Sequence, residues 1–167
     1  MKAKHIAIDA MLTAIALSIF IVELQIPTLV PIPGIKLGLA NIITVFAIFR
    51  VGKKDAALIL FLRILLGAIF SGNMLAIMYS LAGGFLCYLT MILISKILTE
   101  KQIFVCSIIG AVSHNIGQII VAYLVTESAS IFYYLPVLMI SAVITGTFTG
   151  LCAQFVCNRT KSILSKI

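Results

Sequence analysis

Residues 74–98, MLAIMYSLAGGFLCYLTMILISKIL, decide the fold class of this chain, because Lys96 is their only charged residue. A helix needs about 20 consecutive apolar residues to cross a bilayer, and so long a run with so few charges is typical of a membrane-spanning helix. The rest of the chain is similar: of its 167 residues 62% are hydrophobic and 10% charged, and the mean hydropathy is +1.24. We therefore expect an integral membrane protein without a separate soluble domain.

Six apolar segments are bounded by charged residues, prolines and glycines, and each is a predicted membrane span. Their connections are short, so neighbouring helices should run antiparallel. Residues 1–167 are thus expected to form a single all-α domain, a polytopic six-transmembrane-helix bundle. The predicted spans are residues 6–26, 37–50, 55–72, 74–98, 102–125 and 133–157.

The positions of the basic residues predict the orientation of this bundle. Under the six-span arrangement only Lys36 lies on one side of the membrane and only Arg63 lies within a span, so the other ten of the 12 Lys and Arg residues share the opposite side. The positive-inside rule makes that side cytoplasmic. We expect a multi-pass cell-membrane protein with both termini in the cytoplasm. The net charge of +7 is then explained by basic residues that face the cytoplasmic surface of the lipid bilayer. We therefore expect no nucleic-acid partner.

The connection before the second span is unusual. Residues 37–50 form only about 21 Å of helix at 1.5 Å per residue, against a hydrocarbon core of about 30 Å. Pro27, Pro31 and Pro33 deny the preceding segment its helical hydrogen bonds. This segment is predicted to be an extended loop that caps the outer end of the bundle, because irregular backbone at membrane depth must pack on protein or line a cavity. The alternative is an ordinary interfacial connection.

Polar residues within the spans predict a binding pocket in the outer half of the bundle. Such residues are costly in hydrocarbon, so they tend to face the interior and mark a site. Counting along each helix places Glu23, Asn41 and Gln118 at a common height of about 25 Å above the cytoplasmic end. His114 and Arg63 lie deeper, at about 18 Å and about 12 Å.

Further residues extend the predicted pocket. Asn115 is three residues before Gln118 and is assigned to the same stripe of the fifth span. Asn73 and Tyr79, together with the capping loop, are expected to close the pocket from above. The full set predicted to bind the substrate is Glu23, Lys36, Asn41, Arg63, Asn73, Tyr79, His114, Asn115 and Gln118.

Several of these residues also admit a structural interpretation. Arg63 either faces an anionic ligand or a buried carboxylate, or it braces two helices, with Asp9 as a candidate partner. His114 alone fits a packing histidine as well as a ligand contact. Glu23 is also placed to mark the outer membrane boundary, and Lys36 to act as an interfacial anchor.

Small residues at helical spacing predict close contacts between helices. Ala10 and Ala14 lie four residues apart on the first span, where they could pack internally or form a docking surface for a separate membrane subunit. Gly146 and Gly150 repeat the spacing on the sixth span and are predicted to pack internally.

The sequence lacks the motifs that would support catalysis. It has no phosphate-binding loop of the G-x-x-x-x-G-K-[ST] type, and its 5 acidic residues are scattered rather than clustered. Its 2 histidines and 4 cysteines have no metal-ligand spacing. We expect a protein that is not an enzyme, with no cofactor and no metal site.

Four stretches resemble the bacterial membrane proteins of the Gx transporter family, which are also labelled heptaprenyl diphosphate synthase component I. They are residues 33–42 (PGIKLGLANI), 50–56 (RVGKKDA), 63–67 (RILLG) and 71–73 (SGN). This family is similar to the substrate-binding S components of energy-coupling-factor (ECF) transporters. The resemblance implies six helices, both termini inside, an outer pocket capped by the first loop, and an alanine stripe that meets a scaffold subunit. Ala10 and Ala14 match that stripe.

The resemblance and the polar residues together predict a subunit that captures a small vitamin-like or anionic metabolite at the outer face. Uptake would then need a separate transmembrane scaffold subunit and two ATPase subunits. The alternative is a noncatalytic membrane partner of prenyl diphosphate or menaquinone biosynthesis. A third possibility is a small autonomous carrier or channel.

Overall fold

A computed structural model of the protein describes residues 3–26, 36–72 and 74–164. These residues form six α-helices and two short 3-10 helices, with no strand among them, which confirms the all-α prediction. The α-helices are α1 (Ala3–Glu23), α2 (Asn41–Arg50), α3 (Lys53–Ser71), α4 (Met74–Ile94), α5 (Ile103–Thr126) and α6 (Leu135–Leu164), and the 3-10 helices are η1 (Glu100–Gln102) and η2 (Ala129–Tyr134).

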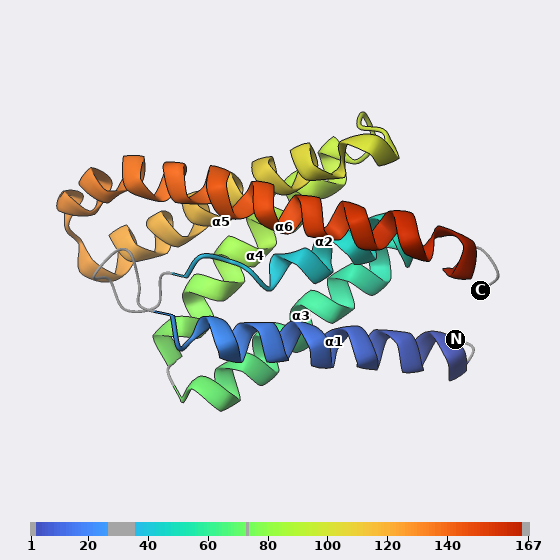
Figure 1. The fold of residues 1–167 in the computed structure, drawn as a ribbon. Helices are drawn as coiled ribbons and strands as arrows, with labels where there is room; N and C mark the ends of the chain where they lie inside the picture. Colours follow the sequence, from blue (N-terminus) through green and yellow to red (C-terminus); the bar gives the residue numbers. More distant parts are fainter. Residues whose placement is uncertain (1–2, 27–35, 73, 165–167) are drawn as a thin grey trace.

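The helices form one elongated bundle with both termini at the same end, which we call the terminal end (Figure 1). The connections from α2 to α3 and from α4 to α5 also lie at this end, whereas α3 meets α4, and α5 meets α6, at the opposite end (Figure 1). Successive helices therefore alternate in direction, as short connections require.

Helix α2 lies at the centre of the bundle. It contacts each of the other α-helices, and Val45 and Ala47 on it are fully buried. Contacts with these five helices bury most of α2, so a helix of 10 residues is held within the bundle. The largest apolar core of the described residues forms around α2, with contributions from α1, α3, α4, α5 and α6.

The observed helix ends differ from the predicted spans in instructive ways. The second span was expected from residue 37, but α2 begins at Asn41, because Gly38 has φ +78°, outside the helical region. The sixth span was expected at residues 133–157, but α6 continues to Leu164. The polar residues after 157 end the apolar segment, yet they do not prevent the helix from continuing. Of the predicted capping loop, residues 27–36, only Lys36 belongs to the described residues.

Glycines allow α4, α5 and α6 to approach closely. A β-carbon on Gly117 of α5 would lie 2.7 Å from the carbonyl oxygen of Ala82 on α4, and one on Gly150 of α6 would lie 2.6 Å from the Cα of Phe104. Such distances leave no room for a side chain, so these contacts depend on glycine. The close packing predicted for Gly146 and Gly150 is confirmed.

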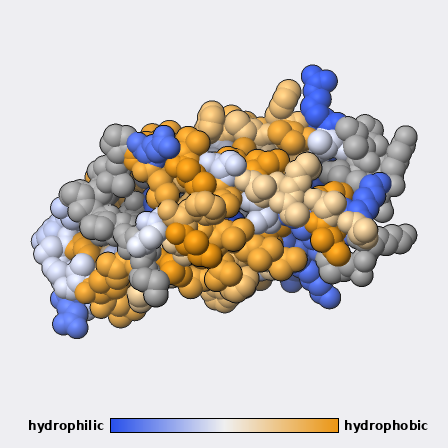
Figure 2. Space-filling view, turned by 90° about the horizontal axis from the view of Figure 1, so that it is seen from below, coloured by the Kyte–Doolittle hydropathy of each residue, from blue (hydrophilic) through white to orange (hydrophobic). Residues whose placement is uncertain are grey.

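The outer surface of the bundle is largely apolar. Figure 2 shows hydrophobic residues over the middle of one face and hydrophilic residues towards its two ends. Large side chains such as Ile69, Leu93 and Phe148 are more than half exposed. Among the described residues, α1, α4, α5 and α6 are long and apolar enough to cross a membrane, and α2 is a shorter apolar helix. This is the architecture of a helical membrane protein; the six-span count and the cytoplasmic orientation of the termini stay predictions.

Candidate functional site

A cluster of polar side chains is buried in the half of the bundle away from the termini. We call it the polar cluster and define it as Glu23, Lys36, Asn41, Arg63, His114 and Gln118. Its members come from α1, α2, α3, α5 and the segment before α2. Apart from the half-buried Lys36, all of them are at most 5% exposed. Burial of this kind requires hydrogen-bonding partners or a ligand.

Glu23 ties the end of α1 to the segment that leads into α2. Its Oε1 accepts a hydrogen bond from the backbone N–H of Gly38. Gly38 can present this N–H because its φ of +78° lies in the left-handed region, which other residues seldom adopt. The carboxylate therefore fixes the turn immediately before α2.

Arg63 lies in the middle of α3, in a charged part of the cluster. Its Nη2 donates to Oδ1 of Asn41 at 3.3 Å, and its guanidinium interacts electrostatically with the carboxylate of Glu23. The ring of Phe20 lies 5.9 Å from the Arg63 Cζ, and Gly67 of α3 packs against the same ring. A buried guanidinium that donates a hydrogen bond to a neighbouring amide is restricted in position, which favours recognition of an anion.

Lys36 brings a second positive charge to the same place. Its Nζ lies 3.9 Å from the centre of the Phe20 ring, within range of a cation–π interaction. Burial lowers the pKa of the Lys36 ammonium to about 8; Glu23 opposes this change and Arg63 adds to it. At neutral pH the ammonium is still mostly protonated, so Lys36 and Arg63 outnumber the single carboxylate of Glu23.

Gln118 holds the Lys36 backbone from the α5 side, and His114 in turn donates to Gln118. With its amide oriented to pair donors with acceptors, Gln118 donates to the Lys36 carbonyl at 3.1 Å and accepts from the Lys36 N–H at 3.2 Å. In the same orientation its Oε1 accepts from His114 Nε2 at 3.2 Å. A β-carbon on Gly83 would lie 2.9 Å from the His114 ring. The histidine is therefore positioned by its neighbours on both sides.

Three buried nitrogens of the cluster have no hydrogen-bonding partner among the described residues. They are Lys36 Nζ, Asn41 Nδ2 and His114 Nδ1. Two of the three are donors in every protonation state, and buried donors without partners are costly. The cluster is thus suited to bind a small molecule that offers oxygen acceptors, above all a carboxylate or another anion.

Other predicted binding residues lie elsewhere. Asn115 points to α6, where its Nδ2 donates to the carbonyl oxygen of Leu138 at 2.7 Å. Tyr79 is buried in a second apolar cluster with residues of α5, η2 and α6. Asn73 lies outside the described residues. Arg63 is bound to Asn41, and the carboxylate of Asp9 has no hydrogen-bonding partner in the part of the chain that the structure describes, so Asp9 is not the brace considered above.

Two residues important to the cluster were not selected from the sequence. Phe20 lies one helical turn before Glu23, a spacing that places both on one face of α1, but an apolar residue among many carries no signal by itself. Gly38 lies within the stretch that carries the family resemblance, and its role in the turn follows only from its φ and its bond to Glu23.

Ala10 and Ala14 lie on the outer surface of α1. Both are exposed, as are Ala3 and Ala7, so none of these alanines packs inside the bundle. Of the two interpretations left open by the sequence, the structure excludes internal packing for Ala10 and Ala14. An exposed stripe of small residues remains available to another helix.

A different set of polar side chains closes the terminal end. Arg50 donates through Nε to the carbonyl oxygen of Cys157 at 3.1 Å, and through both terminal nitrogens to the carboxylate of Glu100 at 3.2 and 3.3 Å. Gln154 donates to the carbonyl oxygen of Lys101 at 2.7 Å and accepts from the N–H of Phe104 at 3.4 Å. We call this set the terminal clamp: Arg50, Glu100 and Gln154. It joins α2, η1, α5 and α6.

Fold and site together define a helical membrane protein with a buried, positively charged polar cluster. A model of the family described as heptaprenyl diphosphate synthase component I matches residues 12–156. The chain belongs to that family, as its sequence predicts. No curated protein and no solved structure matches the chain.

Proposed function

We propose that the protein is the substrate-binding subunit of a membrane importer and captures a small anionic, vitamin-like metabolite at the polar cluster. The observation that carries this proposal is the excess of buried, unpaired donors: Lys36 Nζ and Asn41 Nδ2 find no acceptor among the described residues. A ligand carboxylate would supply those acceptors beside the Arg63 guanidinium. Asn41 holds Arg63 in place, and Gln118 holds the Lys36 backbone, so the donors are ordered before the ligand arrives.

In this proposal the energy for uptake comes from other proteins. The sequence has no nucleotide-binding motif, so a separate transmembrane scaffold and two ATPase subunits would be needed. The exposed alanines Ala10 and Ala14 on α1 are the proposed contact with the scaffold, since small residues let two helices approach closely. The proposal also takes the termini as cytoplasmic, which places the polar cluster towards the outer face.

A binding screen on the purified protein tests the proposal. Native mass spectrometry and thermal-shift measurements in detergent, against a panel of carboxylate-bearing vitamins and related anions, should identify a ligand for the unmodified chain. Lys36→Met should weaken its binding about tenfold or more, as expected for loss of a charged hydrogen bond. Lys96→Met removes the same charge from an exposed site outside the cluster and should leave binding unchanged. Equal effects of the two substitutions would contradict the proposal.

The family supports a second candidate, a noncatalytic membrane partner of a prenyl diphosphate synthase. The match over residues 12–156 is the observation that favours it. The acidic residues of this chain are scattered along the sequence, so chain elongation would belong to a separate enzyme. Co-expression with a long-chain prenyl diphosphate synthase tests this candidate: product length or yield should change when the membrane protein is present, and identical products with and without it would exclude the candidate.

A further inference from the structure

The Lys36 ammonium is buried without the partners that usually accompany a buried charge. Its Nζ has no hydrogen-bonding partner and forms no ion pair with any carboxylate of the described residues. Glu23, the carboxylate of the polar cluster, binds the backbone N–H of Gly38 instead. An unpaired charge inside a protein is costly, so another group must hold this ammonium in place.

The ring of Phe20 is that group. Its centre lies 3.9 Å from Lys36 Nζ and 5.9 Å from Arg63 Cζ. The face of an aromatic ring carries partial negative charge and attracts a cation, most strongly where water is excluded. The two positive charges of the polar cluster therefore converge on one aromatic side chain.

Gly67 determines where this ring lies. Phe20 is only 3% exposed, and a β-carbon at Gly67 would lie 2.7 Å from its Cε1 and 3.0 Å from its Cδ1. Gly67 is one helical turn after Arg63, so the ring packs on the face of α3 that carries the guanidinium. The absence of a side chain at Gly67 thus gives the ring its place beside both cations.

An aromatic ring holds a cation differently from a carboxylate. In the terminal clamp, the guanidinium of Arg50 donates twice to the carboxylate of Glu100, so its charge is balanced and these donors are used. A ring has no formal charge and no oxygen acceptor. An ammonium on its face keeps its positive charge, and those of its three N–H donors that point away from the ring stay free.

We propose that Phe20 is a positioning residue for anion capture: its ring keeps the Lys36 ammonium in the polar cluster without neutralising it. Without the ring, the ammonium would turn to solvent or to Glu23, and an arriving anion would have to draw it back at a cost in affinity. The inference rests on the proposed binding of an anion at the polar cluster, and Phe20 acts through Lys36 rather than on the anion.

The test changes the charge distribution of the ring at nearly constant shape. Phe20 in the full-length protein is replaced by mono-, di- and trifluorinated phenylalanine, because fluorine withdraws electron density from the ring face. The probes are acetate, which carries a carboxylate alone, and its uncharged counterpart acetamide. Acetate affinity should fall stepwise, to about one tenth for the trifluorinated ring, as expected for loss of a cation–π interaction. Acetamide binding should not change.

Binding is followed by NMR of the protein in detergent with isotope-labelled lysine, in which the Lys36 signal is the one that Lys36→Met removes. The side-chain hydrogens of Lys36 near the ring should resonate upfield in the unmodified protein. In Phe20→Leu they should move towards ordinary lysine positions. This check needs no ligand, and a Lys36 signal that is the same in both proteins would overturn the inference.

Fluorination at Phe155 is the matched control. Arg159 Cζ lies 5.4 Å from the Phe155 ring, but this pair lies on α6 outside the polar cluster, and Phe155 is 62% exposed. Acetate affinity should stay constant along that series. If acetate affinity is unaffected by fluorination at Phe20, or falls equally at Phe155, the inference fails while anion capture stands.

Gly67→Ala provides a second measure, because its β-carbon would displace the Phe20 ring. Acetate affinity should fall in this variant. It should persist in Gly84→Ala, whose β-carbon would meet Ile64 at 3.0 Å instead. Equal effects of the two alanines would count against the inference. If neither acetate nor any carboxylate of the binding screen binds the unmodified protein, the proposed function fails and the inference fails with it.

Discussion

The polar cluster and the terminal clamp are two buried or partly buried sets of polar groups, and they differ in how their donors are used. In the terminal clamp, Arg50 reaches a carboxylate and a backbone carbonyl, and the amide of Gln154 both donates and accepts. In the polar cluster, Arg63 has its partner Asn41, but Lys36 Nζ and Asn41 Nδ2 have none among the described residues. The first set can be explained by the fold alone. The second is the better candidate for a ligand site, because native proteins rarely leave buried donors unpaired.

The largest expected effect comes from removing each arginine in turn. Arg63→Gln should destabilise the protein by about 3–5 kcal/mol, because it removes the buried guanidinium near Glu23 and leaves only the half-buried Lys36 as a countercharge. Arg50→Gln should cost only about 1 kcal/mol, since Glu100 is 49% exposed and solvent screens the pair. Thermal or denaturant unfolding in detergent measures both changes.

The two arginines should also differ in ligand binding. Arg63→Gln should abolish it, whereas Arg63→Lys, which keeps the charge but not the fork of donors, should retain a weakened form. Arg50→Gln should leave the affinity unchanged. If Arg50→Gln proves as damaging to binding as Arg63→Gln, the distinction between the two sets does not hold.

A second comparison separates ligand capture from docking. Replacing Ala10 and Ala14 together by leucine adds bulk to the exposed surface of α1 without touching the polar cluster. Uptake by cells that contain the complete importer should be lost, because the helices can no longer approach closely. Affinity in detergent should stay within about 0.5 kcal/mol of the original, the usual range for a surface substitution. Parallel loss of uptake and binding would instead show that the alanines support the fold.

Two glycines with positive φ provide a smaller and more local test. Gly38→Ala and Gly72→Ala should each cost about 1–2 kcal/mol of stability from the left-handed backbone alone. Only at Gly38 would the new β-carbon meet the cluster, 2.9 Å from Asn41 Nδ2; at Gly72 it would meet nothing within 4 Å. Ligand affinity should therefore fall in Gly38→Ala and stay constant in Gly72→Ala. Calorimetric titration of both variants with the identified ligand makes the comparison.

The last comparison concerns pH. The pKa of Lys36 is about 8 in the folded protein, below its ordinary value of 10.5. Affinity for an anion should fall about tenfold between pH 7 and pH 9, as the ammonium loses its proton. Stability without ligand should change in the opposite direction: the unfolded chain binds more protons, so stability rises with pH between about 8 and 10.5. Both Lys36 contributions should disappear in Lys36→Met, and a pH profile of affinity that is the same with and without Lys36 would contradict this assignment.

Much of this arrangement could be predicted from the sequence. Counting residues along the helices placed Glu23, Asn41 and Gln118 at one height, and in the structure all three belong to the polar cluster, where they bind Gly38, Arg63 and Lys36, respectively. Such counting depends only on the helical rise, which varies little. The exposed position of Ala10 and Ala14 agrees with the docking interpretation but does not identify a partner.

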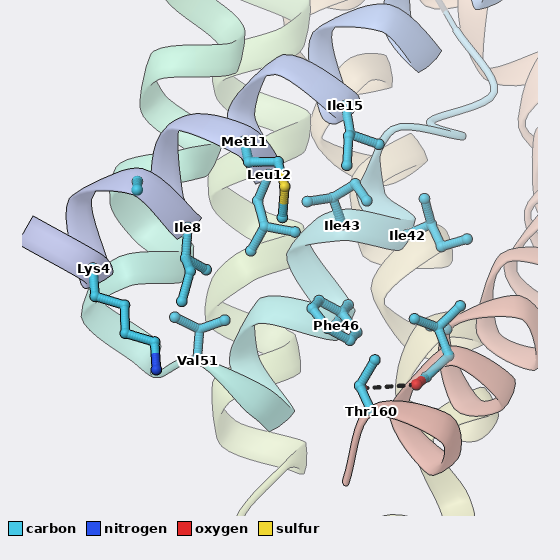
Figure 3. Close-up of a pocket in the computed structure, with 13 residues that line it drawn as sticks. Lys4, Ile8, Met11, Leu12, Ile15, Ile42, Ile43, Phe46, Val51 and Thr160 are labelled. Atoms are coloured by element: carbon cyan, nitrogen blue, oxygen red, sulfur yellow. Dashed lines mark hydrogen bonds between the residues drawn. The ribbon is translucent and has the colours of Figure 1, made fainter. Parts of the chain in front are cut away.

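What could not be predicted depends on how the helices are rotated and which neighbours they meet. Asn115 is one residue after His114, so it faces α6 while His114 faces α4 and the segment before α2. Tyr79 of α4 is buried in the second apolar cluster, with residues of α5, η2 and α6, because the rotation of α4 determines which neighbours its side chain meets. An apolar groove between α1, α2 and α6 was also not predicted (Figure 3). Its residues come from three separate parts of the sequence, and in the sequence they cannot be distinguished from other apolar residues that face the membrane.

The most direct test of the central claim is an experimental structure of the full-length protein in lipid nanodiscs, purified without added ligand and then with the best ligand of the binding screen. We predict density for a small anionic molecule within hydrogen-bonding distance of Lys36 Nζ and Asn41 Nδ2, next to the Arg63 guanidinium. A structure in which both donors bind protein acceptors, with the ligand absent or elsewhere, would contradict the assignment of the polar cluster as the binding site.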